Sequence, residues 1–469
     1  MNQQRMPLYE RLISHKNRNP ISFHVPGHKN GALLYGYKEL PVTLDATELT
    51  GLDDLHDPQG AIAEAQELLA DLYGTRKSYF LVNGSTAGNL AMVMANCQPG
   101  DKVLVQRNCH KSVLNALMLA NVEPLFISPE IDENSLTSTN INPELIKTAF
   151  DREPSIKACI FTYPDYYGNV YDLKSIIDIA RSKGAVVLID EAHGPHFRIG
   201  SPFPPSALDL GADMVVHSAH KTLPAMTMGS YLHVNSDRIL LHKVEHYLSV
   251  LQSSSPSYPI MASLDVARRF VAHYTKNDLD YTLKKRDEFI TQLTQHPNLR
   301  VYIGDDPIKI MLQHEDSSGY ALQEAMEEAG VYPELADPYK VLLILPLLKD
   351  GMDFPFDRAA ENISRIQPGK REHPAPMLQG YKSTRLTRLS ISYPDMMDKQ
   401  FEWIALQESE GRIAAKMVIP YPPGIPLLLP GETITSAHLQ QIQMLRQVNA
   451  RFQGETIEMK EGKVAVFIS

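Results

Sequence analysis

The stretch Ser218-Ala219-His220-Lys221-Thr222 directly follows an apolar run, and Asp190-Glu191-Ala192-His193 directly follows another. A lysine in such a place needs a use, because an ammonium in a low-dielectric site costs several kcal/mol. One use is a Schiff base, in which the deprotonated amine forms an imine with an aldehyde cofactor. An aspartate at the end of another apolar strand can keep the pyridine nitrogen of that cofactor protonated. Lys221 and Asp190 together predict pyridoxal phosphate (PLP).

The composition limits the class of protein. At 469 residues the chain is long enough for about two or three domains. Its 43% apolar and 21% charged residues are typical of a soluble globular protein. The net charge of -10 and the lack of a basic stripe indicate that nucleic acid is not a partner.

Cysteine usage and hydropathy predict the compartment. Cys97, Cys109 and Cys159 lack metal-ligand spacing, and a sparse, odd set is typical of a reducing environment. The segment from Met1 to Arg18 is polar and lacks the apolar core of a secretory signal. No run reaches the ~18 apolar residues of a membrane span. We therefore expect a cytoplasmic protein without a membrane partner.

Apolar runs alternate with amphipathic stretches between about residues 51 and 271. This alternation predicts an α/β domain with a mostly parallel sheet covered by helices on both faces. The expected strands are 78–82, 102–105, 124–127, 158–162, 185–189 and 214–217, and the expected helices include 89–95, 111–120 and 173–182. Ligands gather outside the carboxyl ends of such strands. Asn83, Asp190 and Lys221 all follow strand-like runs, so we expect them at one sheet edge.

The rest of the chain divides into three predicted segments. Residues 1–50 are polar and rich in turns. Residues 272–400 predict a smaller α+β domain, with helices over 278–295 and 320–329 and strands near 308–313 and 341–346. Residues 401–469 form a C-terminal extension, in which the prolines of 419–426 favour an extended path.

Asn83-Gly84-Ser85-Thr86-Ala87-Gly88-Asn89 lies between a predicted strand and a predicted helix. A helix N-terminus offers backbone N–H groups and a positive dipole end to an anion, so this stretch could bind a phosphate. An ordinary helix cap is the alternative. The presence of Lys221 and Asp190 at the same edge favours the phosphate.

Two other interpretations of the histidine-rich stretches are weaker. The DEAH sequence at 190–193 is found in helicases, but a helicase needs the phosphate-binding loop GxxxxGK[ST], which is absent. His193 with His196, and His217 with His220, form H-x-x-H pairs, but this spacing does not fix metal geometry. We expect no metal. His110, after another strand-like run, could stack on a planar cofactor or have a purely structural role.

Four motifs resemble the ornithine/lysine/arginine decarboxylase family, whose members are PLP enzymes of the aspartate-aminotransferase fold (fold type I). They are Phe23-His24-Val25-Pro26-Gly27-His28-Lys29, Arg107-Asn108-Cys109-His110-Lys111-Ser112, Ser218-Ala219-His220-Lys221, and Pro420-Tyr421-Pro422-Pro423-Gly424-Ile425-Pro426 with Pro430-Gly431-Glu432. The resemblance covers nearly the whole chain. The length is similar to that of the short bacillus-type members, without the N-terminal wing domain of the enterobacterial enzymes.

The resemblance implies roles for individual residues. Lys221 matches the lysine that carries the cofactor, Asp190 the partner of its pyridinium nitrogen, and His110 the histidine stacked on its ring. His193 fits the group near the phenolate oxygen. Cofactor-binding or Lys-flanking roles are implied for Ser85, Thr86, Ser218 and His220, and Ser254, within Ser253-Ser254-Ser255-Pro256, resembles a group that reaches the phosphate of a neighbouring subunit. A homodimer or higher oligomer with the active site at an interface is therefore expected.

The sequence departs from its relatives at three places. A Trp replaces His193 in larger members of the family. Met228-Gly229-Ser230 stands where many relatives have Gln-Ala-Ser. Asp165 stands where relatives usually carry Thr. The sequence alone therefore does not identify every side chain that makes a polar contact near the cofactor.

The resemblance implies decarboxylation of a basic L-amino acid to its amine and CO2, feeding polyamine metabolism. Arginine is slightly favoured, followed by lysine and then ornithine. An aminotransferase or lyase of the same fold is the alternative, and Arg385 or Arg388 could then bind the substrate α-carboxylate. A non-catalytic PLP-binding protein is a further alternative.

Overall fold

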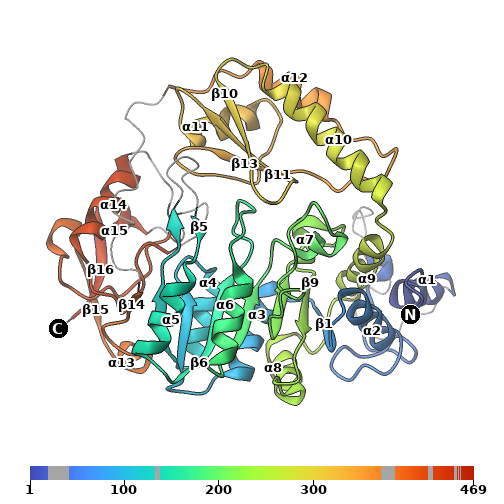
Figure 1. Cartoon of the computed structure of the whole chain (residues 1–469), viewed down its shortest axis with the longest axis horizontal. Helices are drawn as coiled ribbons and strands as arrows, with labels where there is room; N and C mark the ends of the chain where they lie inside the picture. Colours follow the sequence, from blue (N-terminus) through green and yellow to red (C-terminus); the bar gives the residue numbers. More distant parts are fainter. Residues whose placement is uncertain are drawn as a thin grey trace. The chain divides into compact units, whose positions relative to one another are not determined.

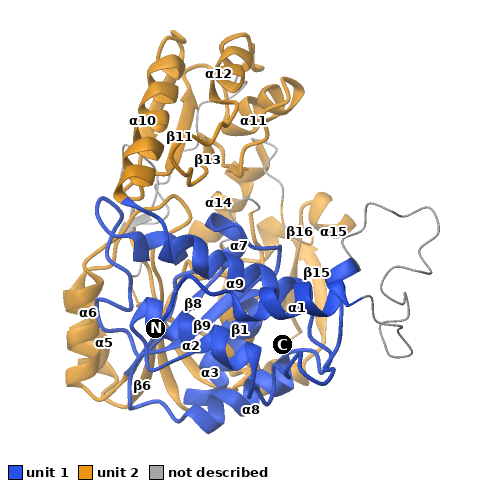
Figure 2. Ribbon diagram, turned by 90° about the vertical axis from the view of Figure 1, so that its right-hand side faces the viewer, with its two compact units in different colours: residues 1–97, 186–275 blue, residues 98–185, 276–469 orange. Residues whose placement is uncertain are grey.

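The computed structural model describes residues 1–18, 42–131, 138–370, 386–420, 426–447, 452, 454 and 456–468. The chain forms two compact units (Figure 2). Unit 1 comprises residues 1–97 and 186–275, and unit 2 comprises residues 98–185 and 276–469. The domain boundaries predicted near residues 50, 271 and 400 stay a prediction.

Unit 1 holds four neighbouring strands of the large sheet, in the order β1-β9-β8-β7. β7 and β8 are parallel, whereas β9 is antiparallel to both β8 and β1. The elements of this unit, drawn in Figure 1, are α1 (Pro7–Asn17), η1 (Val42–Leu44), α2 (Ala61–Tyr73), β1 (Lys77–Leu81), α3 (Gly84–Asn96), β7 (Val186–Asp190), η2 (Pro195–Ile199), β8 (Met214–His217), α7 (Ala219–Thr222), β9 (Ser230–Val234), α8 (Leu241–Leu251) and α9 (Tyr258–Ala272).

Helix α3 lies very close to the strands of unit 1. Every residue of β7 and β8 is buried, as expected for strands covered on both faces. Gly88 of α3 permits the close approach, because a Cβ there would lie 2.5 Å from a methyl of Val216 and 2.7 Å from a methyl of Leu81. Gly88, the second glycine of the Asn83–Asn89 stretch, is therefore required by packing.

A distant aspartate supplies the acceptors for the first turn of α2. Asp53 Oδ2 accepts hydrogen bonds from the backbone N–H groups of Gly60, Ile62 and Ala63 at 2.8–3.2 Å. Asp53 Oδ1 accepts from Gln59 N at 2.9 Å. The carboxylate thereby satisfies N–H groups that a helix start leaves without a partner.

Unit 2 holds the other strands of the large sheet, in the order β6-β2-β3-β14. β2 is parallel to β6 and β3, and β14 is antiparallel to β3. The elements here are β2 (Lys102–Gln106), α4 (Lys111–Leu119), β3 (Glu123–Ile127), β4 (Glu130–Ile131), β5 (Ser138–Asn140), α5 (Pro143–Arg152), β6 (Ile156–Thr162), α6 (Leu173–Ser182) and β14 (Leu386–Arg388). Strand β14 comes from a segment that the sequence analysis assigned to the smaller domain.

A second sheet in unit 2 is antiparallel and has the order β10-β11-β13-β12. Helices α10 and α12 pack on each other, and α11 packs on β11 and β13. The bounds are α10 (Lys276–Leu293), β10 (Leu299–Ile303), β11 (Lys309–His314), α11 (Gly319–Glu328), β12 (Leu335–Ala336), β13 (Val341–Ile344) and α12 (Phe356–Ser364). The α+β pattern expected after residue 272 is present.

The C-terminal part of unit 2 has a core of its own. Buried side chains from Leu406 to Val466 form one apolar cluster. The elements around it are α13 (Tyr393–Met397), β15 (Phe401–Ala405), η4 (Leu406–Glu408), α14 (Ser436–Gln447), α15 (Ile457–Lys460) and β16 (Lys463–Phe467), with β15 antiparallel to β16.

All three cysteines lie in the described part of the chain, where each is buried and forms no disulfide. Cys97 belongs to unit 1, and Cys109 and Cys159 belong to unit 2. Within the described ranges, no helix combines the length and apolar character that a bilayer crossing requires.

Candidate active site

Lys221 and Asp190 follow the carboxyl ends of neighbouring parallel strands. Asp190 is the last residue of β7 and lies opposite Val216 of β8. Lys221 lies in α7, the single helical turn that begins two residues after β8 ends. Two backbone hydrogen bonds, Glu191 N to Val216 O at 3.0 Å and Ser218 N to Ala192 O at 3.3 Å, join the two segments. The predicted convergence of these two side chains at one sheet edge is therefore present.

The Lys221 amine contacts a histidine. Its Nζ lies 2.9 Å from Nε2 of His193. Lys221 is half-buried, and His193 is 3% exposed. An imidazole nitrogen at this distance can accept a proton from the amine, which a lysine must lose before it can act as a nucleophile.

Asp190 is held by an asparagine that the sequence analysis did not single out. Asp190 is 3% exposed, and its Oδ2 accepts a hydrogen bond from Nδ2 of Asn89 at 2.9 Å. Its Oδ1 accepts from Ala192 N at 3.1 Å. Asn89 is the last residue of the stretch 83–89 and lies on the buried face of α3. A polar residue on an otherwise apolar helix face is the sequence feature that could have identified it.

The N-terminus of α3 lies beside the segment that carries Lys221. Asn83 is the N-cap residue, and its side chain makes no capping hydrogen bond. Ser218 Oγ donates to Ser85 Oγ at 2.7 Å, whereas Thr86 is exposed. The first N–H groups of a helix lack acceptors within the helix and favour an anion. Asn83 therefore does not supply the ordinary side-chain cap considered as the alternative, and the phosphate site stays a prediction.

The segment after α7 fixes His220 and the start of α3. His220 N and Nδ1 both contact Gly229 O, at 3.2 and 2.9 Å. Gly84 N donates to Met228 O at 3.0 Å. A Cβ on Gly229 would lie 2.9 Å from Met226 O and 3.0 Å from a methyl of Leu264, so this position leaves little room for a side chain.

Ser254 lies in an exposed turn of the same unit. The neighbouring Ser253 donates its N–H to Asn83 Oδ1 at 3.4 Å, and Ser253 O contacts His56 Nε2 at 2.8 Å. The 253–255 turn thus runs beside the N-terminus of α3 within one chain. Its predicted reach to a neighbouring subunit stays a prediction.

His110 belongs to unit 2 and begins α4. Its Nδ1 lies 2.8 Å from Ser112 Oγ and accepts from Ser112 N at 3.3 Å. These bonds make His110 the N-cap of α4 and fix its ring. This position is compatible with a His110 ring that stacks on a planar cofactor and with one that has a purely structural role.

A buried polar chain runs behind the Asp190 segment. Glu191 Oε2 contacts His217 Nε2 at 3.2 Å, His217 Nδ1 contacts His233 Nε2 at 3.1 Å, and His233 Nδ1 contacts Ser78 Oγ at 2.7 Å. Burial lowers the pKa of His233 well below its usual value, and nearby His217 adds to this effect. Burial raises the pKa of Glu191, although hydrogen bonds from His217 and Ser206 oppose the shift.

The H-x-x-H pairs are engaged in protein contacts. His196 Nδ1 lies 3.1 Å from Thr222 Oγ1, and His217 is part of the buried chain described above. Among the residues that the structure describes, no group of three His, Cys, Asp or Glu side chains could hold a metal ion.

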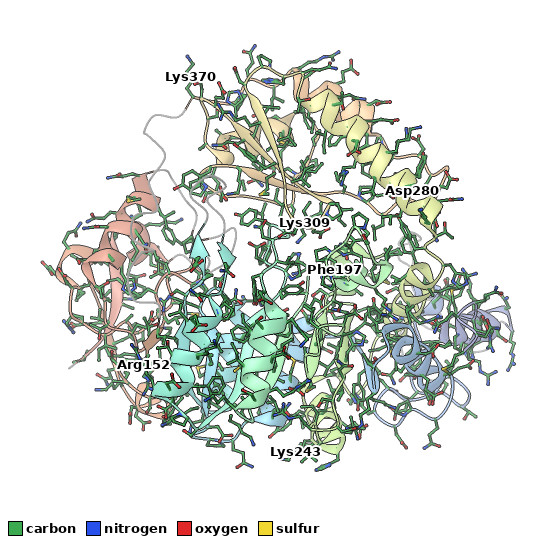
Figure 3. All side chains as sticks on the ribbon, in the orientation of Figure 1. Arg152, Phe197, Lys243, Asp280, Lys309 and Lys370 are labelled. Atoms are coloured by element: carbon green, nitrogen blue, oxygen red, sulfur yellow. The ribbon has the colours of Figure 1, made fainter. Side chains whose placement is uncertain are left out.

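The departure at Asp165 has a structural explanation. Its Oδ1 accepts hydrogen bonds from Tyr167 N at 2.9 Å and Asn169 N at 2.8 Å, so the carboxylate closes the loop after β6. Lys309 of β11, labelled in Figure 3, is fully buried and donates to Tyr166 O at 3.0 Å. Asp165 thus stabilises the backbone of the loop after β6.

Arg388, one of the two arginines considered for an aminotransferase, is paired elsewhere. Its Nη2 lies 2.7 Å from Glu153 Oε2. The motif at 23–29, residues 421–425 and Arg385 lie outside the described residues.

The side chains of unit 1 fit PLP. The unit presents a primary amine, a buried carboxylate held in place by an amide, and a helix N-terminus bearing hydroxyl groups. These are the groups that the aldehyde, the pyridine nitrogen and the phosphate of PLP would need.

Comparison with known proteins decides the family. Residues 6–305 match the major domain of Orn/Lys/Arg decarboxylase, and residues 382–464 match the C-terminal domain of that family. The chain belongs to the Orn/Lys/Arg decarboxylase family. The resemblance stated from the motifs is confirmed, and so is the assignment as a PLP-dependent decarboxylase.

Three relatives of this decarboxylase match over nearly their whole length. An uncharacterized Bacillus subtilis protein, YaaO, is 44% identical, and the match covers 98% of each chain. Arginine decarboxylase of B. subtilis is 34% identical over 94% of each chain, and that of Halalkalibacterium halodurans is 32% identical over 96% of each chain.

Solved structures confirm the predicted fold. The Francisella novicida lysine decarboxylase LdcF has a TM-score of 0.83 at 21% identity, with 99% of this chain and 81% of that chain covered. A serine palmitoyltransferase of Sphingomonas wittichii has a TM-score of 0.54 at 16% identity, covering 77% and 85% of the two chains. The decarboxylase therefore has the α/β fold of type I.

Proposed function

We propose that this decarboxylase acts on L-arginine, with lysine second and ornithine third, and releases CO2 and the corresponding amine. The relatives named arginine decarboxylase are 32–34% identical, whereas those named lysine decarboxylase are 23–24% identical. The observation that carries the proposed chemistry is the Lys221 amine at 2.9 Å from His193, at the sheet edge where β7 ends in the buried Asp190.

The roles of the chain's own residues follow from this arrangement. Lys221 would hold the cofactor, and His193 would take up and return the proton at Lys221 Nζ. Asp190, fixed by Asn89, would hold a proton on the pyridine nitrogen. When bound, PLP accepts the electron pair left behind as CO2 departs. Ser85, Thr86, Ser218, His220 and Ser254 would bind the phosphate or fix the segment that carries Lys221, and His110 would stack on the ring.

Three further predictions belong to the same proposal. The protein acts as a homodimer or a higher oligomer with the site at an interface. It works in the cytoplasm, and its amine product enters polyamine metabolism.

The test is to incubate the PLP-loaded protein separately with L-arginine, L-lysine and L-ornithine. CO2 release and the amine formed are measured together for each substrate. We expect one amine per CO2 and the highest kcat/KM for arginine. A keto acid in place of CO2 would identify an aminotransferase. PLP binding without turnover of any of the three would identify a non-catalytic protein, and a higher kcat/KM for lysine would correct the substrate.

A further inference from the structure

Arg107 and Glu432 form an enclosed ion pair that joins two of the family motifs. The side chain of Arg107 is 14% exposed and that of Glu432 is 6% exposed. Arg107 Nη1 donates to Glu432 Oε1, and Nη2 donates to Oε2 at 2.8 Å. This is the bidentate geometry that gives an Arg–carboxylate pair its directionality. Glu432 lies in the region that matches the C-terminal domain of the family.

The Glu432 carboxylate is fixed by its own segment. Leu429 N donates to Glu432 Oε2 at 2.9 Å. The backbone of Glu432 is held as well, because its N–H donates to Leu429 O at 3.2 Å and its carbonyl accepts from Ala414 N at 2.9 Å. The carboxylate therefore presents a rigid acceptor to Arg107.

Arg107 is connected to His110 by a short and constrained loop. The loop begins where β2 ends, and Arg107 N donates to Ile127 O at 2.8 Å. Cys109 N donates to Gln106 O at 3.2 Å, and the Cys109 side chain is fully buried. His110 then caps α4. These contacts restrain the backbone between Arg107 and His110, so a shift of Arg107 should also move His110.

We propose that Glu432 is a positioning residue, which acts through Arg107 to set the place of the His110 ring against the bound cofactor. This inference rests on the proposed function, in which His110 stacks on PLP. It assigns to the C-terminal domain a part in cofactor binding.

A loss of charge at Glu432 should affect the loop more than an ordinary surface change would. Removing one partner of an enclosed pair leaves the other charge without compensation. Arg107 also donates to Leu427 O at 3.1 Å and Thr387 Oγ1 at 3.4 Å, and these neutral acceptors cannot replace a carboxylate. In E432Q the Arg107 guanidinium should therefore move toward solvent, and the loop from Arg107 to His110 should move with it.

The experiment compares E432Q, H110A and the double variant with the parent protein. Each is stripped of PLP and titrated with PLP, and the dissociation constant is followed by the absorbance of the bound cofactor. E402Q is the matched control, since Glu402 pairs with Arg412 at 2.8 Å in the same domain but is 46% exposed. Thermal unfolding establishes that each variant is folded.

We expect E432Q to raise the dissociation constant by about tenfold, equivalent to ~1.4 kcal/mol, and E402Q to leave it unchanged. H110A should also weaken PLP binding. The double variant should bind no more weakly than H110A alone, because Glu432 acts through that ring.

Unchanged affinity in E432Q, or additive effects of E432Q and H110A, would overturn the proposal. If E432Q does not fold, R107K replaces it, because lysine keeps the charge but cannot make the bidentate contact. A parent protein that binds no PLP, or that decarboxylates no amino acid, would instead contradict the proposed function.

Discussion

The contact between Lys221 and His193 differs from that of another lysine of the chain. Lys340 Nζ lies 3.2 Å from an oxygen of Asp337, and the two side chains form a buried ion pair. Lys221 Nζ lies beside an imidazole nitrogen, which can exchange a proton with it. Lys340 therefore has a structural role, whereas Lys221 is placed to react.

We expect Lys221→Ala to abolish the absorbance of lysine-bound PLP and to reduce CO2 release to background. The substitution removes the only atom of this side chain that can bond to the cofactor aldehyde, while a half-buried position limits the loss of packing. Absorbance titration with PLP and a CO2 assay check this. Lys243→Ala, a half-buried lysine on α8, is the control and should retain both signals. Full turnover in Lys221→Ala would refute the assignment.

Single close contacts decide how the elements of unit 1 pack. The start of α2 depends on the Asp53 carboxylate, and the approach of α3 to β1 and β8 depends on the absence of a side chain at Gly88. Each of these two features can be altered by its own single substitution, which leaves Lys221 and Asp190 unchanged.

Asp53→Asn should lower the free energy of unfolding at pH 7 by about 1–2 kcal/mol, the usual cost of losing a helix cap. Burial opposes ionisation of Asp53, but the hydrogen bonds from Gln59, Gly60 and Ala63 leave its pKa below the ordinary 3.8. A depressed pKa stabilises the fold above the unfolded value, and that contribution is lost as pH falls through the folded value. Urea unfolding at pH 7 and below pH 3.8 should therefore show the difference from the parent shrinking in acid. A constant difference would exclude the charge as the cause.

Gly88→Ala should lower the free energy of unfolding by about 1–3 kcal/mol, because the new methyl group would overlap Val216 and Leu81. Urea denaturation measures the change. Gly369→Ala is the control, since a Cβ at Gly369 would meet no atom within 4 Å. Equal stability of the two variants would show that α3 can move away from the sheet at no cost.

The sequence predicted local elements better than long-range contacts. Strands with uninterrupted apolar runs, such as Met214–His217, agree with the structure to within a residue or two. Helix α1 was not predicted, since only Pro7, Leu8 and Leu12 are buried in a polar segment. The antiparallel direction of β9 and the addition of β14 depend on chain reversals that a single sequence does not encode locally.

The same distinction applies to the candidate site. Lys221 and Asp190 could be found because each follows an apolar strand. Asn89 contacts Asp190 across 101 residues, and Arg107 contacts Glu432 across 325 residues. Such pairings leave no periodic pattern in one sequence, so only the folded chain shows them.

At the scale of the whole molecule, the predicted oligomer makes a test of shared sites possible. If Ser254 of one subunit serves the cofactor of its neighbour, then a mixed dimer of a Lys221→Ala subunit and a Ser254→Trp subunit has both substitutions in the same site. One site then carries both defects and the other carries neither. We expect dissociation and remixing of the two inactive variants to restore part of the CO2 release.

Mixing Lys221→Ala with Asp190→Asn is the matched control. Both residues lie at the edge of the same unit, so each subunit of that mixed dimer keeps a defective site and activity stays low. If mixed dimers of the first pair form, as mass spectrometry can establish, yet remain inactive, Ser254 does not act across an interface.

The three enclosed cysteines give the molecule internal reporters of opening. Burial raises the pKa of the Cys159 thiol, so little of the reactive thiolate is present while β6 stays folded. A thiol-directed dye will therefore label the native chain only at the rate at which it opens. Peptide mapping of the labelled sites distinguishes Cys97 of one unit from Cys109 and Cys159 of the other. The order of modification under mild denaturant then reveals which half of the enzyme loosens first.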